Sequence, residues 1–213
     1  VVRPEELVQV NMDGEGNAVF TNPIWEQIRD RQDVFSGVFA YGDNGFNLTS
    51  GGEIRRAFGN WVSGDYFSTL GVTPVVGRLL TRSDDVAGCA PVAVLGHGFW
   101  RTEFGGVPDI VGKTVSLNRV PHVIVGVADP SFFGVSVGES VQVFVPLCQR
   151  PGLDARSNWF LYVIGRPKPG MTTAQVNARL ESIAPIVYQS TVPPNWGVAE
   201  KSSYLTNSLG VRP

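Results

Sequence analysis

The sequence predicts a mixed fold of α-helices and β-strands in which short strands predominate. Its apolar runs are short, rich in valine and bounded by glycine or proline, a pattern that favours buried strands over helices. Only a few segments carry the caps and the apolar periodicity typical of helices. With 213 residues, 43% hydrophobic and 17% charged, the chain can bury the core of one domain or of two small ones.

The strand pattern is clearest between Pro91 and Asp129. An apolar run there ends at Gly96, and a short helix is stopped by Gly105-Gly106, which a helix interior disfavours. A hairpin follows, with Asn118-Arg119 at its turn. In chain order, strands are expected at residues 7–10, 35–49, 55–62, 92–95, 113–117, 122–127, 141–147 and 159–164.

Helices are expected at four places. The first, at 23–31, is predicted to have Asn22 as its N-cap and Pro23 at its first position. The second, within 63–71, is predicted to have Ser63 as its cap and Gly71 in the left-handed position after its last turn. The third is the short helix at 99–104.

The fourth expected helix is the strongest in the sequence. Thr172 and Gln175 form a capping box, and apolar residues follow on one face as far as Val187. Pro185 is expected to kink or end this helix, because proline lacks the N–H that the helix interior needs. Beyond Gln189 the chain is rich in proline, asparagine and serine, which indicates a linker.

The overall charge argues against a nucleic-acid partner. The chain has 17 basic and 19 acidic side chains, a net charge of −2, whereas nucleic-acid binding usually needs a basic face. The apolar runs are far shorter than the roughly 20 residues that span a bilayer. Val1 opens the chain without an initiator methionine or a signal-peptide pattern, which favours a piece of a longer protein.

The glycines of the central stretch do not form a nucleotide motif. A dinucleotide fingerprint needs G-x-G-x-x-G, and Gly96 and Gly98 are followed by Arg101 at the third place. The letters Gly112-Lys113-Thr114 match the end of a phosphate-binding loop, but Val107 stands where its first glycine belongs. We therefore expect no nucleotide cofactor.

The segment Gly134–Gly138 matches the letters of the G-x-S-x-G nucleophile elbow, with Ser136 as the nucleophile. That elbow needs a strand before the serine and a helix after it, whereas a loop precedes Ser136 and a strand-like run follows. Both histidines, His97 and His122, also come before the serine, against the order of that fold. A surface loop is the favoured interpretation, and a secreted serine hydrolase remains the alternative.

The possible metal ligands are poorly spaced. Cys89, Cys148, His97 and His122 include no close pair of the kind that zinc sites use, so no metal is expected. Asp84-Asp85 is interpreted as a solvated pair of carboxylates in a loop, with weak cation binding as the alternative.

The chain has two cysteines, Cys89 and Cys148, placed just before one expected strand and just after another. If these strand ends lie on the same side of one sheet, a disulfide can form and would stabilise by roughly 3–4 kcal/mol. The spacing alone leaves two free thiols equally open.

Taken together, these segments resemble the MacB-like periplasmic core domain, over about residues 4–190, and within it the duplicated orphan permeases of Acidobacteria. The order and spacing of the motifs carry the resemblance rather than any one of them. The motifs are residues 20–29, 35–37, 62–72, 77–78, 84–85, 91–95, 99–100, 104–106, 110–112, 117–118, 124–127 and 159–167 with the capped helix after them.

The resemblance implies an α+β fold of two parts. A "porter" part with ferredoxin-like βαβ character is expected at 1–76 and 154–190. A mostly β "sabre" part is expected to be inserted at 77–153, and a linker at 191–213 to lead towards the next transmembrane helix. Because the family lies outside the cytoplasm, where disulfides form, the resemblance also favours pairing of Cys89 with Cys148.

The resemblance further implies a non-catalytic periplasmic domain of an inner-membrane ABC-type permease. It would couple movement driven by a cytoplasmic ATPase to export or to a partner protein. The implied partners are the transmembrane helices of its own permease and that ATPase, with a periplasmic adaptor or a second permease copy as further alternatives. A module binding a small ligand or lipopeptide in a cleft between the two parts is the second functional hypothesis.

Overall fold

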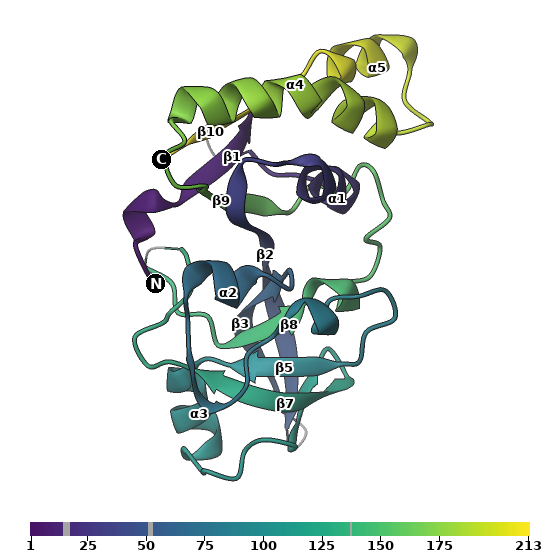
Figure 1. The fold of residues 1–213 in the computed structure, drawn as a ribbon. Coiled ribbons are helices and arrows are strands. Elements are labelled where there is room, and N and C mark those ends of the chain that lie inside the picture. The colour runs from purple at the N-terminus through teal and green to yellow at the C-terminus, as the bar shows by residue number, and fades with distance from the viewer. Residues whose placement is uncertain (15–17, 51–52, 137) are drawn as a thin grey trace. The chain divides into compact units, whose positions relative to one another are not determined.

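The computed structural model describes residues 1–213 except 15–17, 51–52 and 137. The chain forms two compact units (Figure 1). One contains residues 3–40 and 151–213, and the other contains residues 1–2 and 41–150. The second unit is therefore inserted between two segments of the first, and we call it the inserted unit.

The first unit has the strand order of a ferredoxin-like fold. Its sheet runs β10-β1-β9-β2, which is 4-1-3-2 in order along the unit, with β1 antiparallel to both of its neighbours. A helix separates the first strand from the second, and helices separate the third from the fourth. We call it the ferredoxin-like unit. Its elements are η1 (Pro4–Glu6), β1 (Val8–Met12), α1 (Asn22–Arg31), the first part of β2 (Phe35–Ser50), β9 (Tyr162–Pro167), α4 (Thr173–Thr191), α5 (Val198–Leu205) and β10 (Leu209–Arg212).

Helix α1 starts one residue earlier than expected. Thr21, not Asn22, is its N-cap, and the Thr21 hydroxyl accepts a hydrogen bond from the N–H of Ile24. Both residue types cap helices well, so the local sequence does not decide between them. Ile24 and Ile28 are fully buried and Trp25 is nearly so. These side chains anchor α1 in the core of the ferredoxin-like unit, where α1 contacts α4.

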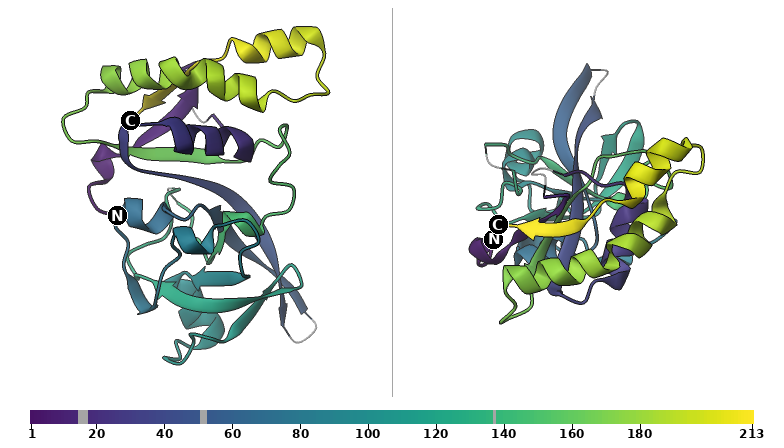
Figure 2. Two further views of the ribbon diagram at one scale, coloured as in Figure 1. Left: turned by 45° about the vertical axis from the view of Figure 1, so that its right-hand side comes forward. Right: turned by 90° about the horizontal axis from the view of Figure 1, so that it is seen from above.

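Helix α4 begins at the predicted capping box of Thr172 and Gln175. It does not end at Pro185 but continues to Thr191. Pro185 lies on the exposed side of the helix, where the carbonyl left without a partner can be solvated. Helix α5 contacts α4 (Figure 2), and the hydroxyls of Thr191 and Tyr204 lie 2.7 Å apart.

The strands of the inserted unit close into a ring. Around it run β2-β3-β8-β5-β7-β6, and β6 returns to β2 through the pair Leu48↔Leu117. Strand β4 lies beside β7, outside this ring. The elements are the second part of β2, β3 (Glu53–Val62), α2 (Tyr66–Leu70), β4 (Pro74–Gly77), η2 (Arg82–Asp84), β5 (Val92–Leu95), α3 (His97–Phe104), β6 (Thr114–Leu117), β7 (Val120–Ala128), β8 (Val143–Pro146) and η3 (Leu147–Gln149).

An aromatic cluster fixes α2 in the core of the inserted unit. The rings of Tyr66, Phe67, Phe132 and Phe144 are all buried, and their centroids lie 5.1–6.1 Å apart, within the range of favourable ring contacts. Gly71 ends α2 with φ of 67°, as the sequence predicts, whereas the cap is Asp65 rather than Ser63.

Asn118 reinforces the closure of the ring. It lies in the turn between β6 and β7 with φ of 51°, a left-handed conformation that asparagine tolerates better than most residues. Its N–H donates to the carbonyl of Asn47 on β2, and its Oδ1 accepts from the N–H of Asn47, both at 2.9 Å. One residue thus supplements the single Leu48↔Leu117 pair with two hydrogen bonds.

We expect Asn118→Ala to lower the free energy of unfolding by about 1–2 kcal/mol, because it adds left-handed strain and removes one acceptor. Asn118→Gly removes the same acceptor without the strain and should cost less. Urea unfolding of both variants measures the difference. Equal stability of the alanine variant and the unaltered chain would contradict a role of Asn118 in closure.

The boundaries between the units differ from those expected. The inserted unit covers 41–150 rather than 77–153, because β2 and β3 pair with each other and join the ring. Residues 191–213, expected as a linker, contain α5 and β10. Strand β10 is the fourth strand of the ferredoxin-like sheet, so the polar C-terminal segment completes the fold.

Candidate functional site

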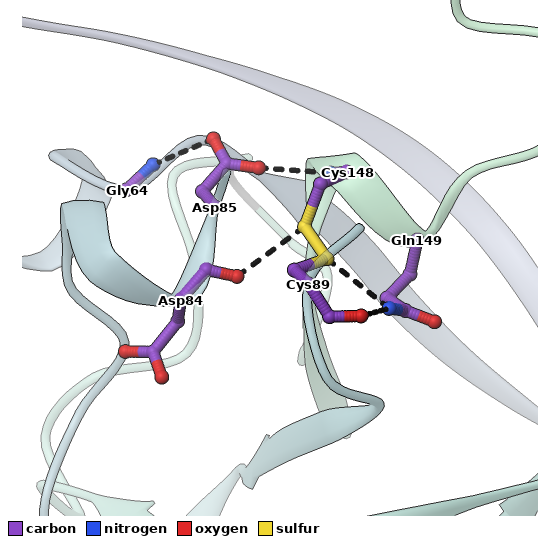
Figure 3. Close-up of a disulfide and its surroundings, with 6 residues drawn as sticks. All are labelled: Gly64, Asp84, Asp85, Cys89, Cys148 and Gln149. Carbon is purple, nitrogen blue, oxygen red and sulfur yellow. Dashed lines mark hydrogen bonds between the residues drawn. A yellow bond between two sulfur atoms is a disulfide. The ribbon is translucent and has the colours of Figure 1, made fainter. Parts of the chain in front are cut away.

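The sequence singled out Cys89 and Cys148, and the structure joins them in a disulfide within the inserted unit (Figure 3). Cys89 precedes β5, and Cys148 lies in η3, directly after β8. Strands β5 and β8 are antiparallel neighbours, so the start of one lies beside the end of the other. This places the two Cα atoms 6.3 Å apart, within bridging distance.

Polar groups hold both sides of this disulfide (Figure 3). One carboxylate oxygen of Asp85 accepts from the N–H of Cys148 at 2.8 Å, and the other accepts from the N–H of Gly64 at 3.0 Å. The amide of Gln149 donates to the carbonyl of Cys89 and approaches its Sγ at 3.1 Å. We call Cys89, Cys148, Asp85 and Gln149 the exit cluster, because the chain leaves the inserted unit at Arg150.

Neighbouring ion pairs order the loop that carries Cys89. The carboxylate of Asp84 accepts two hydrogen bonds from Arg78, at 2.7 and 2.8 Å, and bonds from the backbone and hydroxyl of Thr81. Partial burial would raise the pKa of Asp84, but these bonds outweigh it and hold the pKa below its ordinary value. Arg82 pairs with Asp65 at the start of α2.

The interpretation of Asp84-Asp85 as a solvated pair is therefore wrong. Both carboxylates accept hydrogen bonds from other residues of the chain, and these bonds stabilise the local structure. A signal for this lies in Thr81 and Asp84, which have the spacing of a capping box and form one in η2. No comparable signal marks the role of Asp85 or of Gln149, because their partners are distant in the chain.

Gly96 serves close packing between strands. A Cβ at this position would lie 2.2 Å from the carbonyl oxygen of Val141, and its N–H donates to Gln142 at 2.8 Å. The segment before β8 therefore approaches the backbone of Gly96 directly. A Cβ at Gly98 would have no described atom within 4 Å, so Gly98 has no such role.

The local structure at Ser136 does not fit a serine hydrolase, and both histidines make other contacts. Ser136 lies in a bend, not between a strand and a helix as the nucleophile elbow requires. His97 begins α3, with its ring against Trp100. His122 is only 3% exposed on β7, and its Nδ1 lies 3.0 Å from the carbonyl of Val120. Among the residues that the structure describes, no group of three acidic, histidine or cysteine side chains could hold a metal ion.

The burial of His122 predicts a loss of stability in acid. Burial lowers the pKa of His122 below 6.5, although the hydrogen bond to Val120 opposes this. The unfolded chain therefore binds a proton near pH 6.5 that the folded chain does not yet bind. Stability should fall as the pH drops below about 6.5, by at most about 1.4 kcal/mol per pH unit. It should stop falling once the folded histidine also titrates.

Urea unfolding of His122→Gln between pH 8 and pH 5 tests this prediction, with His97→Gln as the matched control. The His122 variant should lose this part of the pH dependence, and the His97 variant should keep it. The same pH dependence in the His122 variant and the unaltered chain would show that another group is responsible.

This geometry defines a class of fold: an α+β domain with a ferredoxin-like unit and an inserted β unit, here with a disulfide in the inserted unit. Solved extracytoplasmic domains of ABC-type transporters share this fold. The family model of the MacB-like periplasmic core domain matches residues 1–183. The chain belongs to this family.

Two curated proteins are examples of its relatives. The macrolide export ATP-binding/permease protein MacB of Escherichia coli K12 is 30% identical over 126 residues, 58% of this chain and 19% of that protein. MacB of Shigella dysenteriae is 27% identical over 124 residues, with the same coverage. The chain thus spans about a fifth of the length of the curated relatives it matches.

Solved structures share the fold at low sequence identity. The periplasmic region of MacB from Actinobacillus actinomycetemcomitans has a TM-score of 0.66 at 16% identity, covering 97% of this chain and 88% of that one. The extracellular domain of the noncanonic ABC-type transporter YknZ from Gram-positive bacteria has a TM-score of 0.64 at 16% identity, covering 97% of this chain and 100% of that one.

Among the described residues, none of the helices has the length and apolar character needed to span a bilayer.

Proposed function

We propose that this domain is the extracytoplasmic part of an inner-membrane ABC-type permease and passes ATP-driven movement to an exported substrate or a partner protein. The observation that carries the proposal is the interleaving of the two units. The chain passes from the ferredoxin-like unit into the inserted unit at residues 40–41 and returns at 150–151. A displacement of one unit therefore reaches the other through these two covalent connections, in addition to the one at residues 2–3.

The family relationship supports the remaining parts of the proposal. Curated relatives are named ATP-binding/permease proteins, so transmembrane helices and an ATPase are the expected partners in the parent protein. We assign the porter role to the ferredoxin-like unit and the sabre role to the inserted unit, with boundaries at 40–41 and 150–151. A periplasmic adaptor or a second permease copy is the candidate recipient of the movement.

A distance measurement in the parent permease tests the coupling. The permease and its ATPase are placed in lipid nanodiscs, with one spectroscopic label at the exposed Gln189 and another on a cytoplasmic loop. The two cysteines of this domain are paired and do not react with the label, and any other cysteine of the parent permease is first replaced by serine. ATP should change the distance distribution between the two labels. An ATPase variant that binds but does not hydrolyse ATP should show the change caused by binding and not the change caused by hydrolysis. Identical distributions in all nucleotide states would overturn the coupling role.

A further inference from the structure

The two connections of the segment 41–150, where the chain enters and leaves the inserted unit, are held very differently by backbone pairing. The chain enters the unit along β2, which pairs with β3 continuously from Tyr41↔Val62 to Ser50↔Glu53. It leaves along β8, which has 4 residues. Strand β8 pairs with β3 from Gly59↔Val143 to Val62↔Pro146, and with β5 only at Val94↔Phe144 and Leu95↔Val143. By backbone pairing alone, β8 is the weaker of the two.

The exit cluster lies where this weakness would be exposed. Cys148 and Gln149 lie in η3, which follows β8 directly, and the chain passes into the ferredoxin-like unit after Arg150. A load arriving at Arg150 therefore meets the covalent bond of Cys148 before it meets β8. The bond leads to Cys89, which stands just before β5, a strand that pairs on both sides with β7 and β8.

We propose that the exit cluster is a load-bearing clip that keeps β8 from being peeled out of the inserted unit. The proposal rests on the coupling function above and names the part of the domain that makes such coupling possible. The disulfide transfers the load to β5. Asp85 connects the same point to the N–H of Gly64, ahead of α2, and Gln149 fixes the carbonyl of Cys89.

A clip and an ordinary stabilising disulfide make different predictions. A disulfide that acts only on the unfolded chain leaves local openings of the folded state unchanged, apart from those that need global unfolding. A clip acts on the folded state and suppresses opening of the exit segment selectively. Asp85 separates the two cases further, because its hydrogen bonds hold η3 without closing any covalent loop.

Hydrogen exchange on the full 213-residue chain tests the local effect. In Cys89→Ser/Cys148→Ser, amides of residues 143–150 should accelerate at least about tenfold more than those of the β2–β3 pair, which follow only the lower global stability of the inserted unit. Strand β9, in the ferredoxin-like unit, should stay unchanged. Asp85→Asn should accelerate the same exit segment by a smaller factor with the disulfide intact. Asp109→Asn is the matched control, because Asp109 belongs to an exposed ion pair with Lys113 in the same unit. It should leave residues 143–150 unchanged.

Single-molecule pulling from the two termini tests whether the exit cluster bears mechanical load. Once the ferredoxin-like unit has opened, the inserted unit of the oxidised chain should yield at a clearly higher force than that of the double-serine variant, with Asp85→Asn between them. Faster exchange spread evenly over 41–150, unchanged exchange at the exit, or equal yield forces would each overturn the clip. These readouts need no transporter, so their failure is separate from a failure of the nucleotide-dependent movement in the parent permease.

Discussion

Replacing Cys89 and Cys148 by serine is expected to lower the free energy of unfolding of the inserted unit by about 4 kcal/mol. The disulfide closes a loop with a sequence separation of 59 residues, and this loop contains β5, β6, β7 and β8. Without the bond the unfolded chain gains the entropy of that loop, and the folded unit gains nothing in return. Urea unfolding followed by tryptophan fluorescence measures the change, since Trp61 and Trp100 report on this unit.

A reductant provides the matched control for this experiment. It should destabilise the unaltered chain by a similar amount and leave the double-serine variant unaffected, because the chain has no other cysteine. The first residues to respond should be those of the exit cluster. A loss below about 1 kcal/mol would mean that the reduced unfolded state keeps the two segments close, or that the pairing does not form in solution.

Local structure could be predicted where the determining residues are neighbours in the chain. The capping box of Thr172 and Gln175, the hairpin turn at Asn118-Arg119 and the left-handed Gly71 all follow from short-range chemistry, and the structure contains each of them. The family resemblance, which rests on the spacing of such features, is confirmed by the match over residues 1–183.

What depends on distant pairing could not be predicted. Strand β10 has the short sequence Leu-Gly-Val-Arg in a polar segment, and only its pairing with β1 makes it a strand. The same holds for the boundary at residues 40–41, which lies inside the continuous strand β2 with no change of composition to mark it. Periodicity reports burial of one segment and carries no record of its partner.

The exit cluster shows the same limit at the level of single residues. Two neighbouring carboxylates in a polar loop are normally solvated, and nothing near Asp85 in the sequence indicates that Cys148 will lie against it. Gly96 does give a signal, but the signal does not identify the partner, because a glycine after a strand allows close approach of any group. Here that group is the carbonyl of Val141 rather than a phosphate.

A chain shortened to end at Ser190 is expected to lose the folded ferredoxin-like unit. Such a chain stops where the sequence pattern indicates a linker, but it lacks α5 and the outer strand β10. Leu209 and Val211 would no longer fill the core, and Tyr188 would lose the ring of Tyr204, whose centroid lies 5.1 Å away. Hydrogen exchange should show β1 and β9 unprotected, while the inserted unit keeps its protection because its ring of strands is closed within 41–150.

A point substitution separates the loss of β10 from the general effect of shortening. Leu209 is fully buried, so Leu209→Asp places an unpaired charge in the core and should cost at least about 3 kcal/mol. Leu205→Asp makes the same change on α5 at a side chain that is 43% exposed, and it should cost far less. If the shortened chain kept β1 and β9 protected, and Leu209→Asp were as harmless as Leu205→Asp, β10 would be an accessory strand. The domain would then end where its composition changes, and the ferredoxin-like unit would need three strands only.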